Sequence, residues 1–323
     1  MHGCPRWQKY PVRRLEDLQN LVLGAELEVI HMGCSPVRGS LAFAAHDGLI
    51  FSTSLLQSPT LVRGILSSDA MTFCLGLRLP FGARQWLDPV SHGDIGLLQS
   101  GAEYEGLFPS SSLHLALTLD RARLDREATL QGVVLDQRLS DTTGLHPDAI
   151  PQSQILQFRS YILHLHEGDG SDDFPAIERF SKSFLRCLVH HYARRPEGWN
   201  IHQAPRGHAC IVKRARDYIE ANLAAPLSMD AVARAAETSR RTLFRSFEAV
   251  LGEGPLAHAT RLRLHALRKD LLVHDSHRRI ADLAGSVGFR TDAGRASARY
   301  GRLFGELPRD TRALRFERNV NWL

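Results

Sequence analysis

The 323-residue sequence is poor in cysteine and has no long apolar run. Its five cysteines are scattered without a CxxC pair, and their odd number argues against a disulfide framework and for a reducing compartment. No window of about 18 apolar residues is present, so we expect no membrane-spanning helix and no membrane partner. Residues 1–19 lack the apolar core of a signal peptide. We therefore expect a cytoplasmic protein.

Negative charge is in short supply in the last third of the chain. Arg206–Leu323 holds 22 Lys and Arg against 13 Asp and Glu, a net charge of +9, whereas Met1–Pro205 carries a net charge of −4. Most of these basic residues are arginine, the side chain best suited to phosphate and guanine. Solvated helix faces are the alternative interpretation. The asymmetry favours a nucleic-acid partner for the C-terminal third.

Residues 20–139 consist of short apolar runs separated by Gly, Ser and Pro at spacings near a dozen residues. This texture predicts an all-β barrel or sandwich of the cupin-like kind. Such a domain can enclose a small ligand. The candidate effector-lining residues are aromatic groups near the ends of the expected strands, although each is more commonly a core or rim residue: Phe73, Phe81, Trp86 and Tyr104.

Histidines are the next candidates for chemistry in this region. His31, His46, His92 and His114 show no HxH spacing and have no glutamate close by, so we predict neither a metal site nor a cofactor. Residues 147–193 then show two stretches of helical apolar spacing, which predict a helical hairpin. Residues 194–208 are rich in Pro, Gly and charge and predict a linker.

The stretch Leu227–Leu251 predicts two short helices joined by a tight turn. Ser228 and Ser239 are suitable N-caps, and small or apolar residues recur at helical spacing on one face. The opposite face of the second helix begins with Arg240, Arg241 and Arg245. A helix with a small apolar face, a short turn and a second helix with arginines at its exposed start is the helix-turn-helix layout.

The same pattern returns at Ile280–Phe304, where Gly288-Phe289 forms the expected turn and Arg295 and Arg299 follow on the second helix. Between the two motifs, Leu256–Leu272 predicts one long helix of about 25 Å. That length suits two recognition helices about one duplex turn (roughly 34 Å) apart, entering successive major grooves.

Several segments match a known family. Positions 211–315 resemble the DNA-binding domain of the AraC/XylS transcription regulators through SRRTLFRSF at 239–247, RLRLHALRKDLL at 261–272, the I..LA...GF pattern at 280–289 and RLFGELPRDTR at 302–312. Within this family, the sequence motifs most resemble those of the ethanolamine-responsive regulators. The resemblance covers about a third of the chain, and it implies an effector-responsive activator without catalytic residues.

The resemblance also implies a domain organisation in which each part of the chain has its own function. We expect an α+β multidomain protein with an effector-binding and dimerisation domain over 1–193, a linker over 194–208 and an all-α double helix-turn-helix domain over 209–323. The expected partners are double-stranded DNA, a small-molecule effector, a second copy in a homodimer, and RNA polymerase. The expected DNA-contacting residues are Ser239, Arg240, Arg241, Thr242, Phe244, Arg245, Thr291, Asp292, Arg295 and Arg299.

Two departures from the family pattern concern the second motif. The chain is one residue longer between Gly288-Phe289 and Arg295, and Ala296 stands where the family normally has a buried Phe. Both should weaken the packing of the second recognition helix, so we expect the first motif to contribute more of the specificity. Phe244 either contacts a thymine methyl group or turns inward to fill the core.

Two other functions remain open from the residues alone. A cupin-like domain could be a metal-dependent enzyme fused to a DNA-binding module, although no clustered His and Glu ligands are visible. The chain could also be a non-specific architectural DNA binder, whose affinity for a promoter would scarcely exceed its affinity for random DNA. The effector, the operator and the regulated genes are not readable from the sequence.

Overall fold

The computed structural model describes residues 6–34, 36–147, 149–168, 174–193, 200–201, 207–273, 278–289 and 293–314. The chain divides into two compact units. The first comprises Met1–His31 and Val37–Gln203, and the second comprises Met32–Pro36 and Ala204–Leu323. Among the described residues, no helix is both long enough and apolar enough to cross a membrane.

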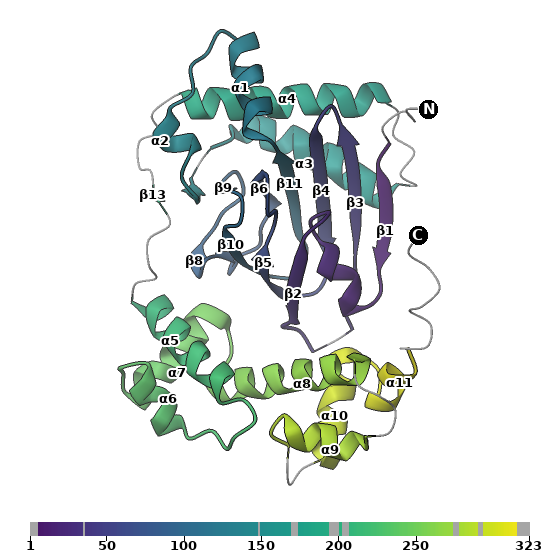
Figure 1. Ribbon diagram of the computed structural model, residues 1–323, viewed down its shortest axis with the longest axis vertical. Coiled ribbons are helices and arrows are strands. Elements are labelled where there is room, and N and C mark those ends of the chain that lie inside the picture. Colours follow the sequence, from purple (N-terminus) through teal and green to yellow (C-terminus); the bar gives the residue numbers. More distant parts are fainter. Residues whose placement is uncertain are drawn as a thin grey trace. The chain divides into compact units, whose positions relative to one another are not determined.

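The first unit is built on two antiparallel sheets (Figure 1). The larger sheet has, in spatial order, β1 (Gln8–Val12), β3 (Gly39–His46), β4 (Leu49–Leu56), β11 (Ser112–Leu119), β6 (Met71–Arg78), β9 (Ile95–Leu98), β12 (Gly144–His146) and β13 (Asn200–Ile201). The smaller sheet has β2 (Glu26–His31), β5 (Thr60–Ile65), β10 (Glu103–Phe108), β7 (Arg84–Gln85) and β8 (Asp88–Pro89). The all-β prediction is confirmed, as two separate sheets rather than a closed barrel.

The helical elements of this unit are the 3-10 helix η1 (Leu15–Asn20) and the α-helices α1 (Arg121–Leu130), α2 (Gln137–Ser140), α3 (Gln152–Glu167) and α4 (Phe174–Ala193). The predicted hairpin is present as α3 and α4. The sequence did not indicate α1 and α2, which fall within the stretch expected to be all-β, or β1, which precedes it.

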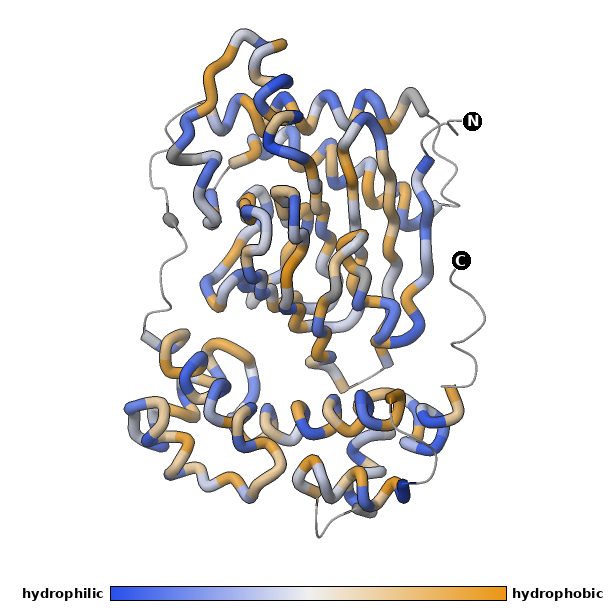
Figure 2. Tube along the Cα trace, in the orientation of Figure 1, coloured by the Kyte–Doolittle hydropathy of each residue, from blue (hydrophilic) through white to orange (hydrophobic). Residues whose placement is uncertain are grey.

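The central strands of the larger sheet are buried on both faces. Seven of the eight residues of β4 are buried, as are seven of the eight of β11, and hydrophobic positions run through this part of the sheet (Figure 2). Strands covered on both sides lose the in–out alternation of a half-exposed sheet. This explains why the sequence shows apolar runs here and alternates clearly only in places.

Helices α3 and α4 pack their aromatic residues against the larger sheet. The ring of Phe51 on β4 lies 5.5 Å from that of Phe180 on α4, and Phe158 on α3 lies 5.5 Å from both Phe180 and Phe184. The indole of Trp7 donates a hydrogen bond of 2.9 Å to the hydroxyl of Tyr161. The apolar faces of the hairpin are therefore covered by the chain's own β-sheet.

The second unit is all-α, as predicted. Its helices are α5 (His208–Ala221), α6 (Met229–Ala235), α7 (Arg240–Leu251), α8 (Pro255–Val273), α9 (Ile280–Ser286), α10 (Ala293–Phe304) and α11 (Pro308–Ala313). The predicted long spacer is α8, whose 19 residues extend about 28 Å. Leu264, Leu267 and Leu271 of α8 belong to the core that also holds α9 and α10.

Candidate functional site

The turn of the first motif is closed by a backbone hydrogen bond. Helix α6 buries Val232 and Ala233, and the N–H of Thr238 donates to the carbonyl of Ala233 at 2.9 Å. Between them Glu237 has a positive φ of 52°, a left-handed conformation that is uncommon for a residue with a side chain. This geometry ends α6 sharply and allows α7 to start at Arg240, three residues after Glu237.

Helix α7 begins with a side-chain cap. The hydroxyl of Ser239 accepts a hydrogen bond of 3.2 Å from the backbone N–H of Thr242, and it donates one of 3.0 Å to the Thr242 hydroxyl. The predicted cap at Ser239 is therefore confirmed. Ser228 also holds the N-cap position of α6, but its side chain makes no capping hydrogen bond.

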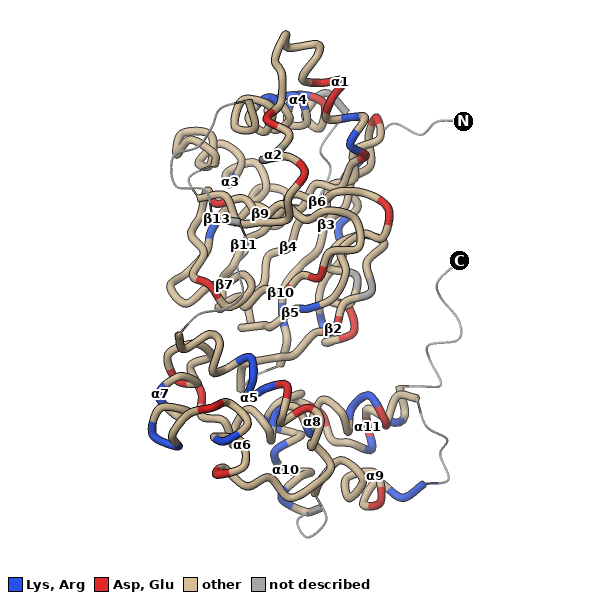
Figure 3. Tube along the Cα trace, turned by 60° about the vertical axis from the view of Figure 1, so that its left-hand side comes forward, with Lys and Arg blue, Asp and Glu red and all other residues tan. Residues whose placement is uncertain are grey.

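One face of α7 is basic and open to solvent. Arg240, Arg241 and Arg245 are exposed, whereas Leu243 and Phe247 of the same helix are fully buried. Figure 3 shows basic residues along α7. The Nε atom of Arg240 lies 3.6 Å from a carboxylate oxygen of Asp230, too far for a strong hold on either exposed side chain.

Phe244 lies outside the core. Its side chain is 41% exposed, and two of its ring carbons lie 3.8 Å from the point where a Cβ on Gly254 would stand. The ring therefore rests beside the turn that follows α7. Of its two expected roles, filling the core does not agree with this position.

The second motif repeats the turn of the first. The N–H of Phe289 donates to the carbonyl of Ala284 at 2.9 Å, and Gly288 has a positive φ of 101°. Arg295 and Arg299 on α10 are exposed. Thr291 and Asp292, which the sequence suggested as contact residues, lie outside the described residues.

The register of the two recognition helices shows a difference that the sequence did not reveal. Both helices have 12 residues and end at a glycine with positive φ, Gly252 at 68° and Gly305 at 75°. Counting back from these glycines pairs the α7 residues Arg240, Arg241, Phe244 and Arg245 with the α10 residues Ala293, Gly294, Ser297 and Ala298. The large side chains of α7 thus correspond to small ones on α10.

The arginines of α10 stand at other positions of the helix. Arg295 corresponds to Thr242 and Arg299 to Ser246 in the same register. In the sequence these arginines looked like a second copy of the first basic face. Only the common length and the shared C-terminal glycines of the two helices reveal the offset.

Arginines of the spacer helix α8 form hydrogen bonds within the second unit. The guanidinium of Arg261 donates to Glu253 at 2.9 Å. Arg263 donates to the carbonyl oxygens of Leu223 and Ala225, at 2.9 and 2.7 Å, and so satisfies the end of α5. These two side chains are therefore held by partners within the chain.

Arg268 is the most deeply buried of the α8 arginines, at 4% exposure. It donates to the carboxylate of Glu306 at 2.7 Å and to the hydroxyls of Tyr300 and Thr311 at 3.3 Å. A buried cation with three polar partners is satisfied, and it fixes α10 and α11 to the spacer.

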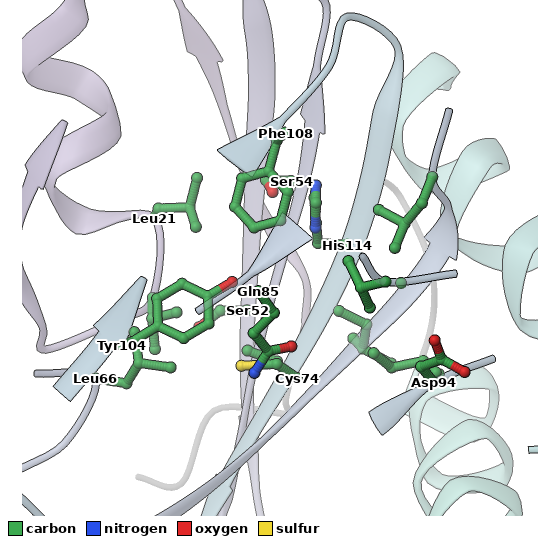
Figure 4. A pocket seen from close by; sticks show the side chains of 17 residues that line it. Leu21, Ser52, Ser54, Leu66, Cys74, Gln85, Asp94, Tyr104, Phe108 and His114 are labelled. Atoms are coloured by element: carbon green, nitrogen blue, oxygen red, sulfur yellow. The ribbon is translucent and has the colours of Figure 1, made fainter. Parts of the chain in front are cut away.

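A small interior cavity of about 40 Å³ lies between the two sheets of the first unit (Figure 4). Its wall is largely apolar, and a few polar groups reach it from several strands. The polar and sulfur-bearing residues of the wall are Ser52, Ser54, Cys74, Gln85, Asp94, Tyr104 and His114. A space of this size holds about two or three waters, or a ligand group of similar volume.

Three titratable groups of this wall, Cys74, Tyr104 and His114, are uncharged at neutral pH. Burial raises the pKa of the Cys74 thiol to about 12. Burial, with a smaller contribution from Cys74, raises the pKa of Tyr104 well above its usual value. Burial, with a smaller contribution from His166, lowers the pKa of His114 to about 3. Desolvation disfavours the charged form in each case.

Only one of the four expected effector residues lines the cavity. Tyr104 lies in its wall. Phe73 is fully buried and packs against Tyr192 at 5.5 Å, Phe81 is fully exposed, and the indole of Trp86 donates to the carbonyl of Glu103 at 3.0 Å. Sequence reasoning missed Gln85 and Cys74, because neither stands in a pattern that marks a binding residue.

His166 is held in one tautomer by its partners. The hydroxyl of Thr53 donates to the carbonyl of His114 at 2.6 Å, so His166 Nε2, 3.2 Å away, must donate to Thr53. His166 Nδ1 then accepts from the hydroxyl of Ser40 at 2.7 Å. Among the described residues, no group of three or more His, Cys, Asp or Glu side chains could hold a metal ion.

The comparison with protein families concerns the second unit. A family model described as a helix-turn-helix domain matches residues 232–314, a range that contains both turns, both recognition helices and the spacer α8. Residues 232–314 of the second unit therefore match a helix-turn-helix domain. The resemblance noted in the sequence is confirmed at this level.

The curated proteins similar to this chain are named as regulators of transcription. The chain is 35% identical over 135 residues to the "Probable thc operon regulatory protein" of Rhodococcus erythropolis, which covers 42% of this chain and 39% of that protein. It is 30% identical over 182 residues to the HTH-type transcriptional activator RhaS of Salmonella paratyphi A, covering 55% of this chain and 62% of that protein. The chain thus spans less than two thirds of either relative.

A solved structure is similar to about a third of the chain. The transcriptional regulator with an AraC-type DNA-binding domain from Chromobacterium violaceum is 32% identical to the chain, with a TM-score of 0.31, and the match covers 32% of this chain and 91% of that one.

Proposed function

We propose that this protein is a sequence-specific DNA-binding transcription regulator that acts in the cytoplasm as an effector-responsive activator. The observation that carries the proposal is the repeated helix-turn-helix, whose first recognition helix exposes Arg240, Arg241 and Arg245 in its first two turns. An exposed helix with several arginines near its N-terminal end fits the major groove of duplex DNA.

Base recognition on this account is concentrated in α7. Arg240, Arg241 and Arg245 would bind guanine O6 and N7 or clamp phosphates, and the Ser239 and Thr242 hydroxyls would contact the backbone. The exposed ring of Phe244 is suited to a thymine methyl group. Helix α7 itself is fixed by buried Leu243 and Phe247, which gives the reading side chains a rigid base.

Helix α10 would bind DNA mainly through the backbone. In the shared register its counterparts of the α7 reading positions are small residues, which leave few groups able to reach base edges. Arg295 and Arg299 are exposed and can contact phosphates, with Thr291 and Asp292 as further contacts at the start of the helix. Phosphate contacts position the protein without specifying a sequence.

The first unit would sense an effector through its interior cavity and would hold two copies together. An enclosed, mostly apolar space with a few convergent polar groups is the usual form of a small-molecule site. A homodimer would match a two-part operator, since paired half-sites mirror two-fold symmetry. Activation would involve contact with RNA polymerase, as the activator named among the relatives suggests.

Selection of bound sequences from a random duplex library, followed by competition at fixed salt, tests the proposal. We expect an enriched motif that binds about a thousandfold or more tightly than scrambled DNA of equal length. A ratio near one would support the architectural alternative instead. Stoichiometric iron or zinc in the purified protein, together with turnover of a substrate, would favour the enzyme alternative and would contradict the proposed absence of catalysis.

A further inference from the structure

Two nitrogen atoms of the interior cavity wall have no hydrogen-bond partner within the described part of the chain. They are Nε2 of Gln85 and Nε2 of His114, and both are inaccessible to solvent. A buried polar group without a partner costs about 1–3 kcal/mol, so native proteins satisfy nearly all of them with protein groups, water or a ligand. Both atoms belong to side chains that line one cavity, and an occupant that displaces the atoms covering them would supply the missing hydrogen bonds.

Gln85 reaches this space from the end of the short strand β7. Gln85 is 5% exposed and lies on β7, and its amide covers Gly96 on β9 so closely that a Cβ there would overlap it. The next two residues, Trp86 and Leu87, both have positive φ, at 50° and 68°, which is unusual for residues with large side chains. They are the two turn residues of the β7–β8 hairpin, in which Gln85 pairs with Asp88, so this turn fixes the place of Gln85 at the end of β7.

The remaining wall favours an uncharged occupant. Figure 4 shows Gln85 between Tyr104 and Cys74, with His114 beside the ring of Phe108. Cys74, Tyr104 and His114 are neutral at physiological pH for the reasons given above. The one carboxylate of the wall, Asp94, already accepts a hydrogen bond of 2.8 Å from the backbone N–H of Ser91. An anion moved from water into such a space would lose its hydration and gain no opposite charge, whereas a cation would meet only the carboxylate of Asp94.

We propose that the effector presents to this cavity a small uncharged group that both accepts and donates hydrogen bonds, a primary amide or a group of equivalent chemistry, bound by Gln85 Nε2 and His114 Nε2. The carbonyl oxygen of the group accepts from the Gln85 amide, and its N–H donates to the neutral imidazole of His114. This assignment rests on the proposed effector response and names the chemical class that the response would recognise.

Three probes of nearly equal shape separate this class from its charged analogues. Acetamide, acetate and acetamidinium each have four heavy atoms and differ in carrying no charge, a negative charge or a positive charge. Binding to the full-length protein without DNA is followed by saturation-transfer NMR on the methyl group of each probe. Because so small a ligand makes few contacts, we expect acetamide to bind with a Kd of about 1 mM, and both ions to bind at least about tenfold more weakly.

A matched pair of variants tests whether acetamide binds at Gln85. Gln85→Met keeps the length of the side chain and removes the amide, so it should weaken acetamide by about tenfold. Gln157→Met makes the same change on the exposed face of α3 and should leave acetamide binding unaltered. If Gln85→Met does not fold, as judged by circular dichroism, the comparison of the three probes with the unaltered protein still decides.

Several outcomes would overturn the assignment. They are equal binding of the three probes, stronger binding of acetamidinium (which would make Asp94 the recognising group), no saturable binding up to about 100 mM, or unaltered acetamide binding in a folded Gln85→Met. None of these results bears on DNA recognition, which is measured separately. Acetamide that binds as expected but leaves promoter occupancy unchanged would uphold the ligand class and remove the effector role.

Discussion

Glu237 and Gly288 occupy the same position in two copies of one turn. Each has a positive φ, 52° for Glu237 and 101° for Gly288, and each is followed by a residue whose N–H donates 2.9 Å back to an alanine carbonyl. The surroundings differ. A Cβ at Gly288 would stand 2.7 Å from Arg263 Nε and 2.8 Å from the carbonyl of Leu223, whereas Glu237 is exposed and pairs with Arg214.

The two turns should therefore respond differently to substitution. Gly288→Ala combines a left-handed alanine with a steric clash against Arg263, which satisfies the end of α5, and should lower the free energy of unfolding by about 2–4 kcal/mol. Glu237→Gly removes left-handed strain but adds freedom to the unfolded chain, so its effect should stay within about 1 kcal/mol. Urea unfolding measures both, and equal effects would contradict the distinction.

The two serine caps provide a second paired test. Ser239→Ala should lower the free energy of unfolding by about 1 kcal/mol, because Ser239 accepts from the Thr242 N–H. Ser228→Ala should lower the free energy of unfolding by less, since that hydroxyl makes no capping hydrogen bond in α6. Thermal unfolding of the two variants side by side is the measurement. A larger loss for Ser228→Ala would show that the capping assignment is wrong.

The position of Phe244 predicts a separation of stability from specificity. Because its ring is 41% exposed, Phe244→Ala should shift the melting temperature by only a few degrees, on the order of 1 kcal/mol. The preference of this variant protein for thymine at one operator position should be about tenfold weaker than that of the unaltered protein. Melting and base-by-base competition on the same sample distinguish this outcome from a core role, which would appear as a large loss of stability with unaltered preference.

Buried histidines predict sensitivity to acid. Burial is the main reason why the pKa of His146 falls to about 3 and those of His166 and His191 fall to about 4. In the unfolded chain these groups take up protons near pH 6.5, so protonation favours unfolding, and stability is lost as the pH falls from about 6.5 toward 4.

His191→Gln isolates one contribution to this loss. Between pH 6 and pH 4.5 the free energy of unfolding of the unaltered protein should fall more steeply than that of the variant, by up to about 1.4 kcal/mol per pH unit. Replacement of the exposed neighbour, His190→Gln, serves as the control and should leave the slope unchanged. Parallel slopes in all three proteins would contradict the buried neutral state of His191.

Much of the second unit was predictable because its local signals agree with its tertiary structure. Ser239 as a cap, Gly288 at the turn and Leu243 on the buried face each follow from residue type and helical spacing. The offset of Arg295 and Arg299 was not predictable, since it depends on where α10 begins and ends. Ala296, which stands where the family normally has a buried Phe, is itself buried in the core that also holds Tyr300.

For the first unit, only the β fold class was predictable from the sequence. Apolar runs indicate strands, but strands buried on both faces give no alternation that fixes their register or their order in a sheet. Gln85 reaches the interior cavity because distant Gly96 leaves room for it, a relationship between two strands that no local pattern records. Phe81 shows the converse, since an aromatic residue near a strand end proved fully exposed.

The central claim is that α7 reads the sequence and α10 mainly holds the backbone. Its most direct test is the ratio of the Kd values for scrambled and selected DNA, at one salt concentration, for Arg240→Ala/Arg245→Ala and for Arg295→Ala/Arg299→Ala. We predict that the first pair lowers this ratio by about 100-fold or more, while the second weakens both DNAs alike and leaves the ratio within about threefold. An equal fall of the ratio in the two double variants would contradict the claim.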